Sequence, residues 1–214
     1  RDVEGAVPEP VFINAFLVLL KMYESRDLNQ SLQYLEKAIE ATQLVKKDAP
    51  VEVYNNIGVI HFIKQQFEAL TEFFLIALDK LSSFDGKDEK AAKLKDIDTT
   101  IRYNIARSKE NADETSSIEI YEDLQRENPD YFSAKLRLLF LQCTLKDSKK
   151  EDLKAEVDLL LALAALDLEV RAFYGWFIHT FGNKLGVKSE EDTKHQKDTL
   201  VEHDLHDCYA LLLL

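Results

Sequence analysis

The sequence predicts an all-α protein, built as a right-handed solenoid of stacked helix pairs. Only six glycines and four prolines occur among the 214 residues, so little of the chain favours turns or a sheet. Apolar residues recur at helical spacing between them. A short pattern of bulky and small residues also returns at intervals of about 34 residues, the period expected when helix pairs stack into an array.

The clearest helix pair covers residues 53–81, VYNNIGVIHFIKQQFEALTEFFLIALDKL. It matches the tetratricopeptide pattern, in which a bulky residue is followed by a Leu-Gly pair and a second bulky residue. Glycine costs about 1 kcal/mol relative to alanine inside a helix. Gly58 therefore predicts two helices that cross too closely to admit a side chain. The matching positions are Tyr54, Ile57, Gly58 and His61 in the first helix, and Phe74 and Ala77 in the second.

Weaker copies of the pattern follow downstream. From Ala106 to Leu139 is 33 residues and from Leu139 to Gly175 is 36, both close to the expected period. The longer interval after Gly58 contains the polar stretch 82–96, which we interpret as an insertion that extends the flanking helices. We expect the packing positions of these repeats to be Ala106, Tyr121, Pro129 and Gly175, with Pro129 closing a second helix.

Less regular segments lie on either side of these repeats. A degenerate pair precedes them, with a first helix in residues 11–24 and a second in residues 29–44. At the other end, residues 207–214 begin a first helix that stops inside a repeat, so both ends read as cuts in a longer array. We predict about five helix pairs, some degenerate, in one continuous solenoid over residues 10–214, with residues 1–9 as a tail or linker.

The composition excludes several classes of function. The 39 acidic and 27 basic residues give a formal net charge of -12, which disfavours direct binding to nucleic acid or to anionic lipid. No apolar run reaches the roughly 18 residues of a membrane span. The nearest, residues 159–170, predicts a buried helix. Cys143 and Cys208 lack the spacing of a disulfide framework, which indicates reduced thiols in an intracellular protein.

The sequence contains no recognisable catalytic motif: it has no glycine-rich phosphate loop, no G-x-S-x-G and no H-E-x-x-H. We therefore expect no enzyme activity and no cofactor. The densest group of potential metal ligands is His195, His203, His206 and Cys208. We interpret them as solvated linker residues beside one thiol and predict no bound metal, with a metal site as the open alternative.

The surface most informative about function is the inner groove of the predicted solenoid, which first helices line. On each first helix, the residues one and five places after the bulky opening position point inward. Most of this face is apolar or aromatic, which suits a partner helix or an extended apolar segment; packing against neighbouring helices is the alternative for each aromatic residue. Arg107 is the only basic groove residue, so a clamp for C-terminal carboxylates does not fit. The predicted groove residues are Asn55, Val59, Phe62, Tyr103, Arg107, Leu136, Phe140 and Trp176.

The stretches YNNIGV, TIRYNIAR, IYEDLQRENPDYFSAKLRL and HDLHDCYAL occur in this order along the chain. Through them, the sequence from about residue 50 onward resembles the large tetratricopeptide subunits of the RNA polymerase II-associated factor (Paf) complex, in their fungal form. The resemblance implies a nuclear, non-enzymatic scaffold whose solenoid holds other subunits. It also implies indirect association with elongating RNA polymerase II and chromatin, and a part in histone modification.

One different class of protein stays open at this point. The same repeats could form the regulatory tetratricopeptide arm of a larger enzyme or of a ubiquitin-related assembly, with its catalytic domain outside this sequence. The sequence beyond Arg1 and Leu214 would separate the two readings, because a catalytic fold there would favour the arm, whereas further repeats and a charged tail would favour the scaffold.

Overall fold

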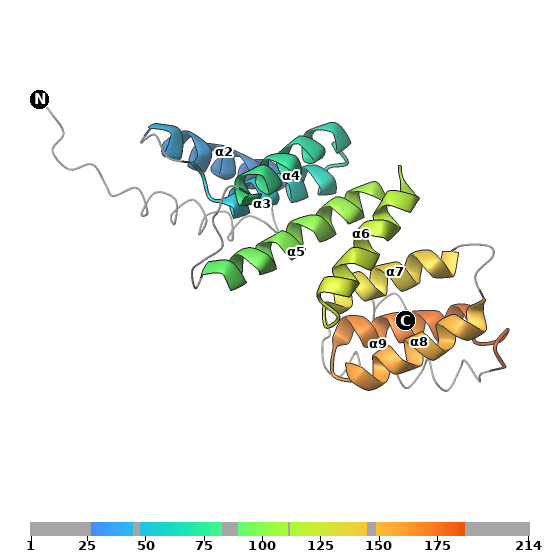
Figure 1. Ribbon diagram of the computed structural model, residues 1–214. Helices are drawn as coiled ribbons and strands as arrows, with labels where there is room; N and C mark the ends of the chain where they lie inside the picture. The colour runs from blue at the N-terminus through green and yellow to red at the C-terminus, as the bar shows by residue number, and fades with distance from the viewer. Residues whose placement is uncertain (1–26, 45–47, 83–89, 111, 145–148, 187–214) are drawn as a thin grey trace, which may run out of the picture. The chain divides into compact units, whose positions relative to one another are not determined.

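The computed structural model describes residues 27–44, 48–82, 90–110, 112–144 and 149–186. All regular secondary structure in these ranges is α-helical (Figure 1), which confirms the predicted all-α fold class. The chain divides into two compact units, residues 1–117 and 118–214. Several predicted features lie outside the described residues: the tail at 1–9, the first helix at 11–24, the histidine-cysteine group at 195–208 and the helix start at 207–214.

Four helices form the described part of the first unit. Among them α3 is central, because it packs against α2, α4 and α5. The α3–α4 pair is the one that the glycine pattern predicted, and α2 is the predicted second helix of the degenerate pair. Residues 90–96 of the predicted insertion form the first turns of α5. The four helices are α2 (Leu28–Leu44), α3 (Val51–Ile63), α4 (Phe67–Ser82) and α5 (Lys90–Lys109).

A tight turn joins α3 to α4. Gln65 adopts a φ of 59°, in the left-handed region that ends many helices. Its backbone N–H donates to the carbonyl of Phe62 at 2.9 Å, and the N–H of Gln66 donates to the carbonyl of His61 at 2.9 Å. The turn thereby satisfies carbonyl groups that the end of α3 would otherwise leave unpaired.

Gly58 lies where α3 and α4 cross. A Cβ atom at this position would lie 2.5 Å from Cε1 of Phe74, closer than real Cβ contacts. The Phe74 ring is itself buried, with 1% of its surface exposed, so the ring has no room to move aside. The glycine therefore gains tertiary packing at the expense of helix propensity.

The core of the first unit extends on both sides of this crossing. One cluster joins α2 to α3, and a second joins α3, α4 and α5. Ala106 is fully buried in α5. The buried members of the first cluster are Leu35, Val53, Ile57 and Ile60, and those of the second are Ala49, Val51, Tyr54, Ala77 and Ile101.

In the described part of the second unit, three helices all pack against one another: α7 (Phe132–Thr144), α8 (Lys150–Leu163) and α9 (Leu168–Phe181). The helix α6 (Glu114–Glu127) runs across the boundary between the units and buries Tyr121 completely. Pro129 lies in the turn after α6, where the Gln125 side chain donates to the carbonyl of Tyr131 at 2.8 Å.

The buried core of the second unit combines leucine and aromatic side chains from α7, α8 and α9. Gly175 is buried within α9. Asp167 begins that helix as its N-cap, because its carboxylate accepts from the backbone N–H of Val170 at 3.0 Å. The fully or nearly fully buried members are Leu139, Val157, Phe177 and Ile178.

The prediction of a buried helix over residues 159–170 is wrong. The helix α8 ends at Leu163 and α9 begins at Leu168, with a turn between them. Leu160 and Ala164 face the core, but Leu159, Leu163 and Leu166 are largely exposed. The run is apolar on two faces of the helix, and only one of those faces can meet the core.

Candidate partner-binding site

The predicted groove residues fall into two sets, one in each unit. Those of the first unit lie on α3 and α5, two first helices that contact each other, and those of the second unit lie on α7 and α9, which also contact each other. The first set is Asn55, Val59, Phe62, Tyr103 and Arg107, and the second is Leu136, Phe140 and Trp176. Each set therefore marks a face made by two first helices within one unit.

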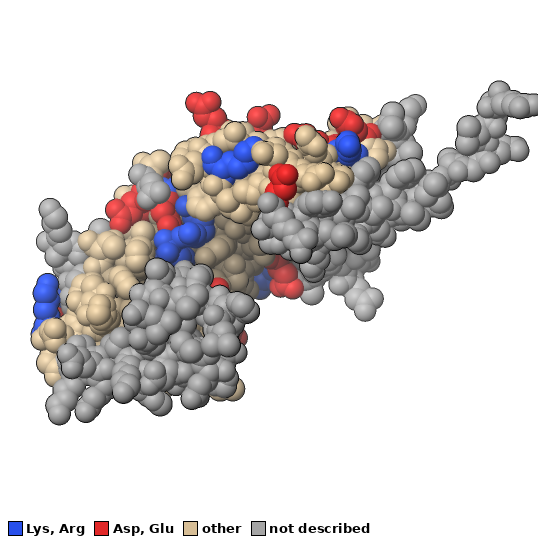
Figure 2. All heavy atoms as spheres, turned by 180° about the vertical axis from the view of Figure 1, so that it is seen from behind, with Lys and Arg blue, Asp and Glu red and all other residues tan. Residues whose placement is uncertain are grey.

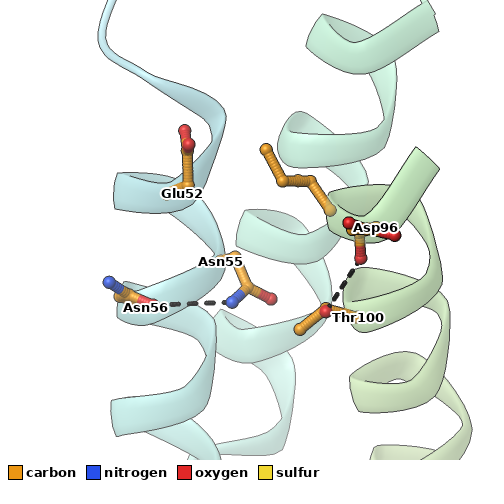
Figure 3. A pocket seen from close by; sticks show the side chains of 6 residues that line it. Glu52, Asn55, Asn56, Asp96 and Thr100 are labelled. Atoms are coloured by element: carbon orange, nitrogen blue, oxygen red, sulfur yellow. Dashed lines mark hydrogen bonds between the residues drawn. The ribbon is translucent and has the colours of Figure 1, made fainter. Parts of the chain in front are cut away.

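A cavity of about 300 Å³ opens between α3 and α5 (Figure 3). Residues three and four apart on a helix share a face, and both helices contribute such a triplet to the cavity wall. Asn55 was predicted from the sequence, whereas the other five lining residues were not. The lining consists of Glu52, Asn55 and Asn56 from α3, and Asp96, Ile97 and Thr100 from α5.

Hydrogen bonds fix the orientation of the amides at this cavity. The Nδ2 of Asn104 on α5 donates to Oδ1 of Asn55 on α3 at 2.9 Å, which joins the two helices. The Nδ2 of Asn55 lies 3.5 Å from Oδ1 of Asn56, a long hydrogen bond that holds the two amides side by side (Figure 3). Thr100 donates to the backbone carbonyl of Asp96 at 2.9 Å. The wall is therefore ordered by its own contacts.

The charge at this cavity is negative. Glu52 and Asp96 are its charged lining residues, and they stand on opposite helices (Figure 3). The lining contains no lysine or arginine. The lining side chains are carboxylates, amides, one threonine and one isoleucine, yet most of the surface that they expose to the cavity is apolar, so two carboxylates stand at a largely apolar cavity. Such a wall can receive cationic or hydrogen-bonding groups of a ligand.

Farther along the same face, Arg107 is engaged by its neighbours. Its guanidinium forms a salt bridge with Glu110 at 2.9 Å and lies 5.9 Å from the centre of the Phe62 ring. Val59 and Tyr103 are half-buried on α3 and α5. These contacts leave Arg107 poorly placed to serve as an isolated anion-binding group.

The face of the second unit is aromatic. The ring of Trp176 lies 5.1 Å from that of Phe140 and 5.3 Å from that of Phe173. The Arg137 guanidinium lies 4.7 Å from the centre of the Phe140 ring, in a cation–π contact. Phe140, Phe173 and Trp176 are all half-buried. They contact one another and still expose part of their surface.

Leu136 behaves differently from the two aromatic members of its set. Only 7% of its surface is exposed, and it belongs to the core cluster of the second unit. Little of this side chain is left for a partner. The spacing pattern predicted Leu136 as a groove residue one place after the bulky opening position of its helix. The residue does lie on a first helix, α7, but its side chain faces the core and not the exposed surface of that helix.

Metal binding and membrane insertion have no support in the described residues. No group of three or more histidine, cysteine, aspartate and glutamate side chains in the described ranges could hold a metal ion. Within the same ranges, no helix is long and apolar enough to cross a membrane. His61 makes a 2.7 Å hydrogen bond with Gln66 and stacks on Phe73, which gives it a structural explanation.

No family model matches the chain. The chain is 37% identical over 205 residues to RNA polymerase-associated protein CTR9 of Saccharomyces cerevisiae, a stretch that covers 95% of this chain and 18% of that protein. It is 31% identical over 150 residues to the protein of the same name from Caenorhabditis elegans, covering 64% of this chain and 13% of the relative. It is 24% identical to tetratricopeptide repeat protein 1 of Schizosaccharomyces pombe over 97% of this chain and 19% of that protein.

A solved structure supports the fold. The crystal structure of a tetratricopeptide repeat protein from Parabacteroides merdae matches 94% of this chain and 70% of its own chain, with a TM-score of 0.56 and 15% sequence identity. Together with the helix pairs described above, this match confirms an all-α helical-repeat fold of the tetratricopeptide type. The chain spans less than a fifth of the length of the curated relatives. The resemblance seen in the sequence is likewise confirmed, because nearly the whole chain is similar to a segment of RNA polymerase-associated protein CTR9.

Proposed function

We propose that this chain is a non-enzymatic scaffold segment of an RNA polymerase II-associated factor complex, located in the nucleus, that holds other subunits on the faces of its first helices. The observation that carries the proposal is 37% identity over 95% of the chain to a relative named RNA polymerase-associated. That relative favours the scaffold over the regulatory arm of an enzyme. Because the chain spans 18% of the relative, the proposal concerns the binding surfaces of this segment.

The two first-helix faces would contribute different kinds of contact. At α3 and α5, a partner segment would place cationic or hydrogen-bonding groups near Glu52, Asn56 and Asp96. Because the 2.9 Å bond between Asn104 and Asn55 already orders the wall, binding would require little rearrangement of these side chains. This face would supply orientation and specificity more than affinity.

At α7 and α9, the contact would be apolar and aromatic. Trp176 and Phe140 present large, rigid rings held by mutual contact at 5.1 Å. Tryptophan and other large aromatic residues dominate the energetics of many protein interfaces, because they bury much apolar area at low cost in conformational entropy. We therefore expect an apolar side chain of a partner helix or extended segment to pack on these two rings.

Association with chromatin and RNA polymerase II would be indirect, through the other subunits. On the face that Figure 2 shows, the lysine and arginine side chains form small separate groups among acidic and uncharged residues. A nucleic-acid surface normally requires a continuous basic patch. The net charge of -12 acts in the same direction.

Affinity purification of the intact tagged protein from nuclear extract, followed by identification of its partners, tests the proposal. We expect subunits of an RNA polymerase II-associated complex to be recovered with the wild type. Trp176→Glu and Phe140→Glu should each reduce that recovery, by about tenfold if the rings contribute like typical interface anchors. Circular dichroism should show nearly unchanged helix content, because both side chains are half-buried.

Phe67→Glu provides a matched control. Phe67 is an aromatic residue on α4 with 49% of its surface exposed, and it lies outside both first-helix faces. Its replacement should leave partner recovery unchanged. Undiminished recovery with Trp176→Glu, or a loss of helix content in that variant, would contradict a role for the aromatic face in binding. Recovery of no transcription-related subunit by the wild type would contradict the scaffold proposal itself.

A further inference from the structure

Three polar side chains follow one another along the side of α5 that meets α3. Asp96 and Thr100 line the cavity between the two helices (Figure 3), and Asn104 bonds across to Asn55 of α3. Residues four apart share a face of a helix and are separated by about 6 Å along its axis. We call Asp96, Thr100 and Asn104 the α5 stripe.

Each member of the α5 stripe presents a hydrogen-bond acceptor. The Asp96 carboxylate is an acceptor at neutral pH. The hydroxyl hydrogen of Thr100 is already donated to the backbone carbonyl of Asp96, at 2.9 Å, so the hydroxyl oxygen keeps a lone pair for an incoming donor. Nδ2 of Asn104 is held by Asn55, and Oδ1 of Asn104 makes no hydrogen bond within the described part of the chain. A ligand that contacts all three oxygens must therefore supply donors.

The charge of the α5 stripe favours neutral donors. Asp96 is its one charged member, and Thr100 and Asn104 are uncharged. A row of ammonium or guanidinium groups would lose hydration at the two neutral positions without meeting an opposite charge. Backbone N–H groups are neutral donors, and a helix uses nearly all of them internally, whereas an extended segment has them available. The α5 stripe thus matches the backbone of an extended polypeptide.

Spacing and shape agree with an extended ligand. In an extended chain, the N–H groups of alternate residues point to the same edge and lie about 6.6 Å apart, close to the separation of successive members of the α5 stripe. The side chains of those alternate residues share one face of the segment. Most of the surface exposed to the cavity is apolar, and its volume is about 300 Å³. The cavity can therefore receive an apolar side chain from that face.

We propose that the α3–α5 face binds an extended segment of a protein partner through its backbone. N–H groups of alternate residues donate to the α5 stripe, and an apolar side chain enters the cavity. The inference rests on the proposed function, which places a partner on this face, and it specifies the conformation and chemistry of the bound segment. Recognition of this kind tolerates many sequences, because backbone groups make the hydrogen bonds and only the residue at the cavity is selected.

A defined peptide tests the inference with the 214-residue chain and without any other subunit. The probe is a fluorescent ten-residue peptide of alternating valine and threonine, with blocked ends and with one lysine and one glutamate as its terminal residues. Two further peptides carry backbone N-methyl groups, on the valines in one and on the threonines in the other. We expect one methylated peptide to bind at least about tenfold more weakly than the probe in fluorescence anisotropy, because it lacks the donors on the bound edge.

A helix-forming peptide of ten residues serves as the comparison for conformation. Its backbone N–H groups are occupied by its own hydrogen bonds, so it should also bind at least about tenfold more weakly than the probe. The methylated peptide that keeps the donors on the bound edge should lose less affinity than its counterpart. This order of affinities distinguishes recognition of an extended backbone from attraction to valine side chains alone.

Thr100→Val tests the α5 stripe itself. The substitution keeps the shape of the side chain and removes its oxygen, so it should weaken binding of the probe about fivefold. Thr71→Val is the matched control, because Thr71 of α4 donates to the carbonyl of Phe67 at 3.0 Å in the same way and lies outside the cavity. The control should leave binding unchanged, and circular dichroism should show the same helix content in both variants.

Equal binding of all the peptides, tighter binding of the helix-forming peptide, or indifference to Thr100→Val would overturn the inference. Its failure is distinguishable from failure of the proposed function. Recovery of transcription-related subunits from nuclear extract, without any preference for the probe, would overturn the inference and leave the scaffold proposal in place. A preference for the probe that Thr100→Val reduces would support the inference whichever subunits are recovered.

Discussion

The α3–α4 pair and the α7–α8 pair are each a first helix followed by a second helix, yet they pack differently. In α3 the small position of the pattern is Gly58, and in α7 the corresponding position is Leu139, which is completely buried. The helices α3 and α4 approach closely along much of their length, whereas α7 and α8 approach closely at few positions. The pair with glycine at the small position is thus the pair whose helices approach closely, and the pair with leucine there is the one whose helices lie farther apart.

The exposed faces of the two units differ as well. The first unit has an acidic and amide-lined cavity between α3 and α5, and the second has an aromatic cluster on α7 and α9. Repeat spacing places first helices beside one another in both units. The side chains on these two faces differ in chemistry although the helices beneath them are arranged alike, so one repeat backbone can present different surfaces.

The largest effect should come from Leu139→Ala. The side chain is fully buried in the core cluster of the second unit, so its truncation leaves a cavity and should cost about 3 kcal/mol of unfolding free energy. Urea unfolding followed by the fluorescence of Trp176, the single tryptophan of the chain, would measure it in this unit. A cost below about 1 kcal/mol would mean that α7 and α8 close together once the leucine is shortened.

Gly58→Ala should have the next largest effect, in the first unit. Alanine gains about 1 kcal/mol of helix propensity, but its Cβ would overlap the buried Phe74 ring. We expect a net destabilisation of about 1–2 kcal/mol from overpacking, measured by amide hydrogen exchange in α3 and α4. If Gly58→Ala is stabilising, the close crossing of α3 and α4 does not depend on the glycine.

Gln65→Gly sharpens the comparison at the turn that makes the close α3–α4 hairpin possible. Gln65 has a φ of 59°, which glycine adopts at lower cost than a residue with a side chain. We expect a stabilisation of about 0.5–1 kcal/mol in the same hydrogen-exchange measurement. Gln66→Gly is the matched control and should be neutral or destabilising, since the positive φ belongs to Gln65 alone among the described non-glycine residues.

The smallest expected effect on stability comes from a salt bridge. Each of the two helix pairs has one that is formed by a lysine. Lys80 of α4 bonds to Asp48, just before α3, at 2.8 Å, and Lys135 of α7 bonds to Glu156 of α8. The hydrogen bond to Asp48 raises the pKa of Lys80 above its usual 10.5. A raised lysine pKa contributes stability that is fully present below pH 10.5 and is lost as the pH rises through the folded-state pKa.

Lys80→Met should therefore lower stability by less than about 1 kcal/mol at neutral pH, as for other solvent-accessible ion pairs. The difference between wild type and variant should narrow as the pH is raised from 9 to beyond the folded-state pKa of Lys80. Denaturation in urea at several pH values would follow this difference. A constant difference would show that the charge of Lys80, which pairs with Asp48 and lies over the Tyr54 ring with Nζ 5.2 Å from its centre, does not contribute to stability.

The sequence is informative wherever one residue decides a local contact. Gly58, Phe74 and Ala77 could be assigned to a helix crossing because the pattern fixes both their spacing and their sizes. The cavity residues Glu52 and Asp96 could not be paired in advance. They lie on α3 and α5, which are separated in the sequence by α4, and Asp96 is itself the last residue of the predicted insertion. The sequence does not say where the insertion lies relative to α3.

Exposure was harder to predict than helix position. Leu136 and Leu159 are both leucines in apolar helical runs, yet the first is 7% exposed and the second 60%. Composition alone cannot distinguish them, because α8 is apolar on two faces and only its neighbours determine which face is covered. The side chains that a partner could reach are therefore visible only after the helices are assembled.

The contact between Gly58 and the Phe74 ring also restricts how this pair of positions can evolve. Alanine at 58 becomes acceptable only if the ring at 74 is first replaced by a smaller side chain, and that replacement alone opens a void. Each single step is thus unfavourable, while Gly58→Ala with Phe74→Leu should cost less than the sum of the two, a coupling that a double-mutant cycle would measure. A repeat that has glycine at this position can therefore change into one that has a larger residue there only if two residues, one on each helix, change together.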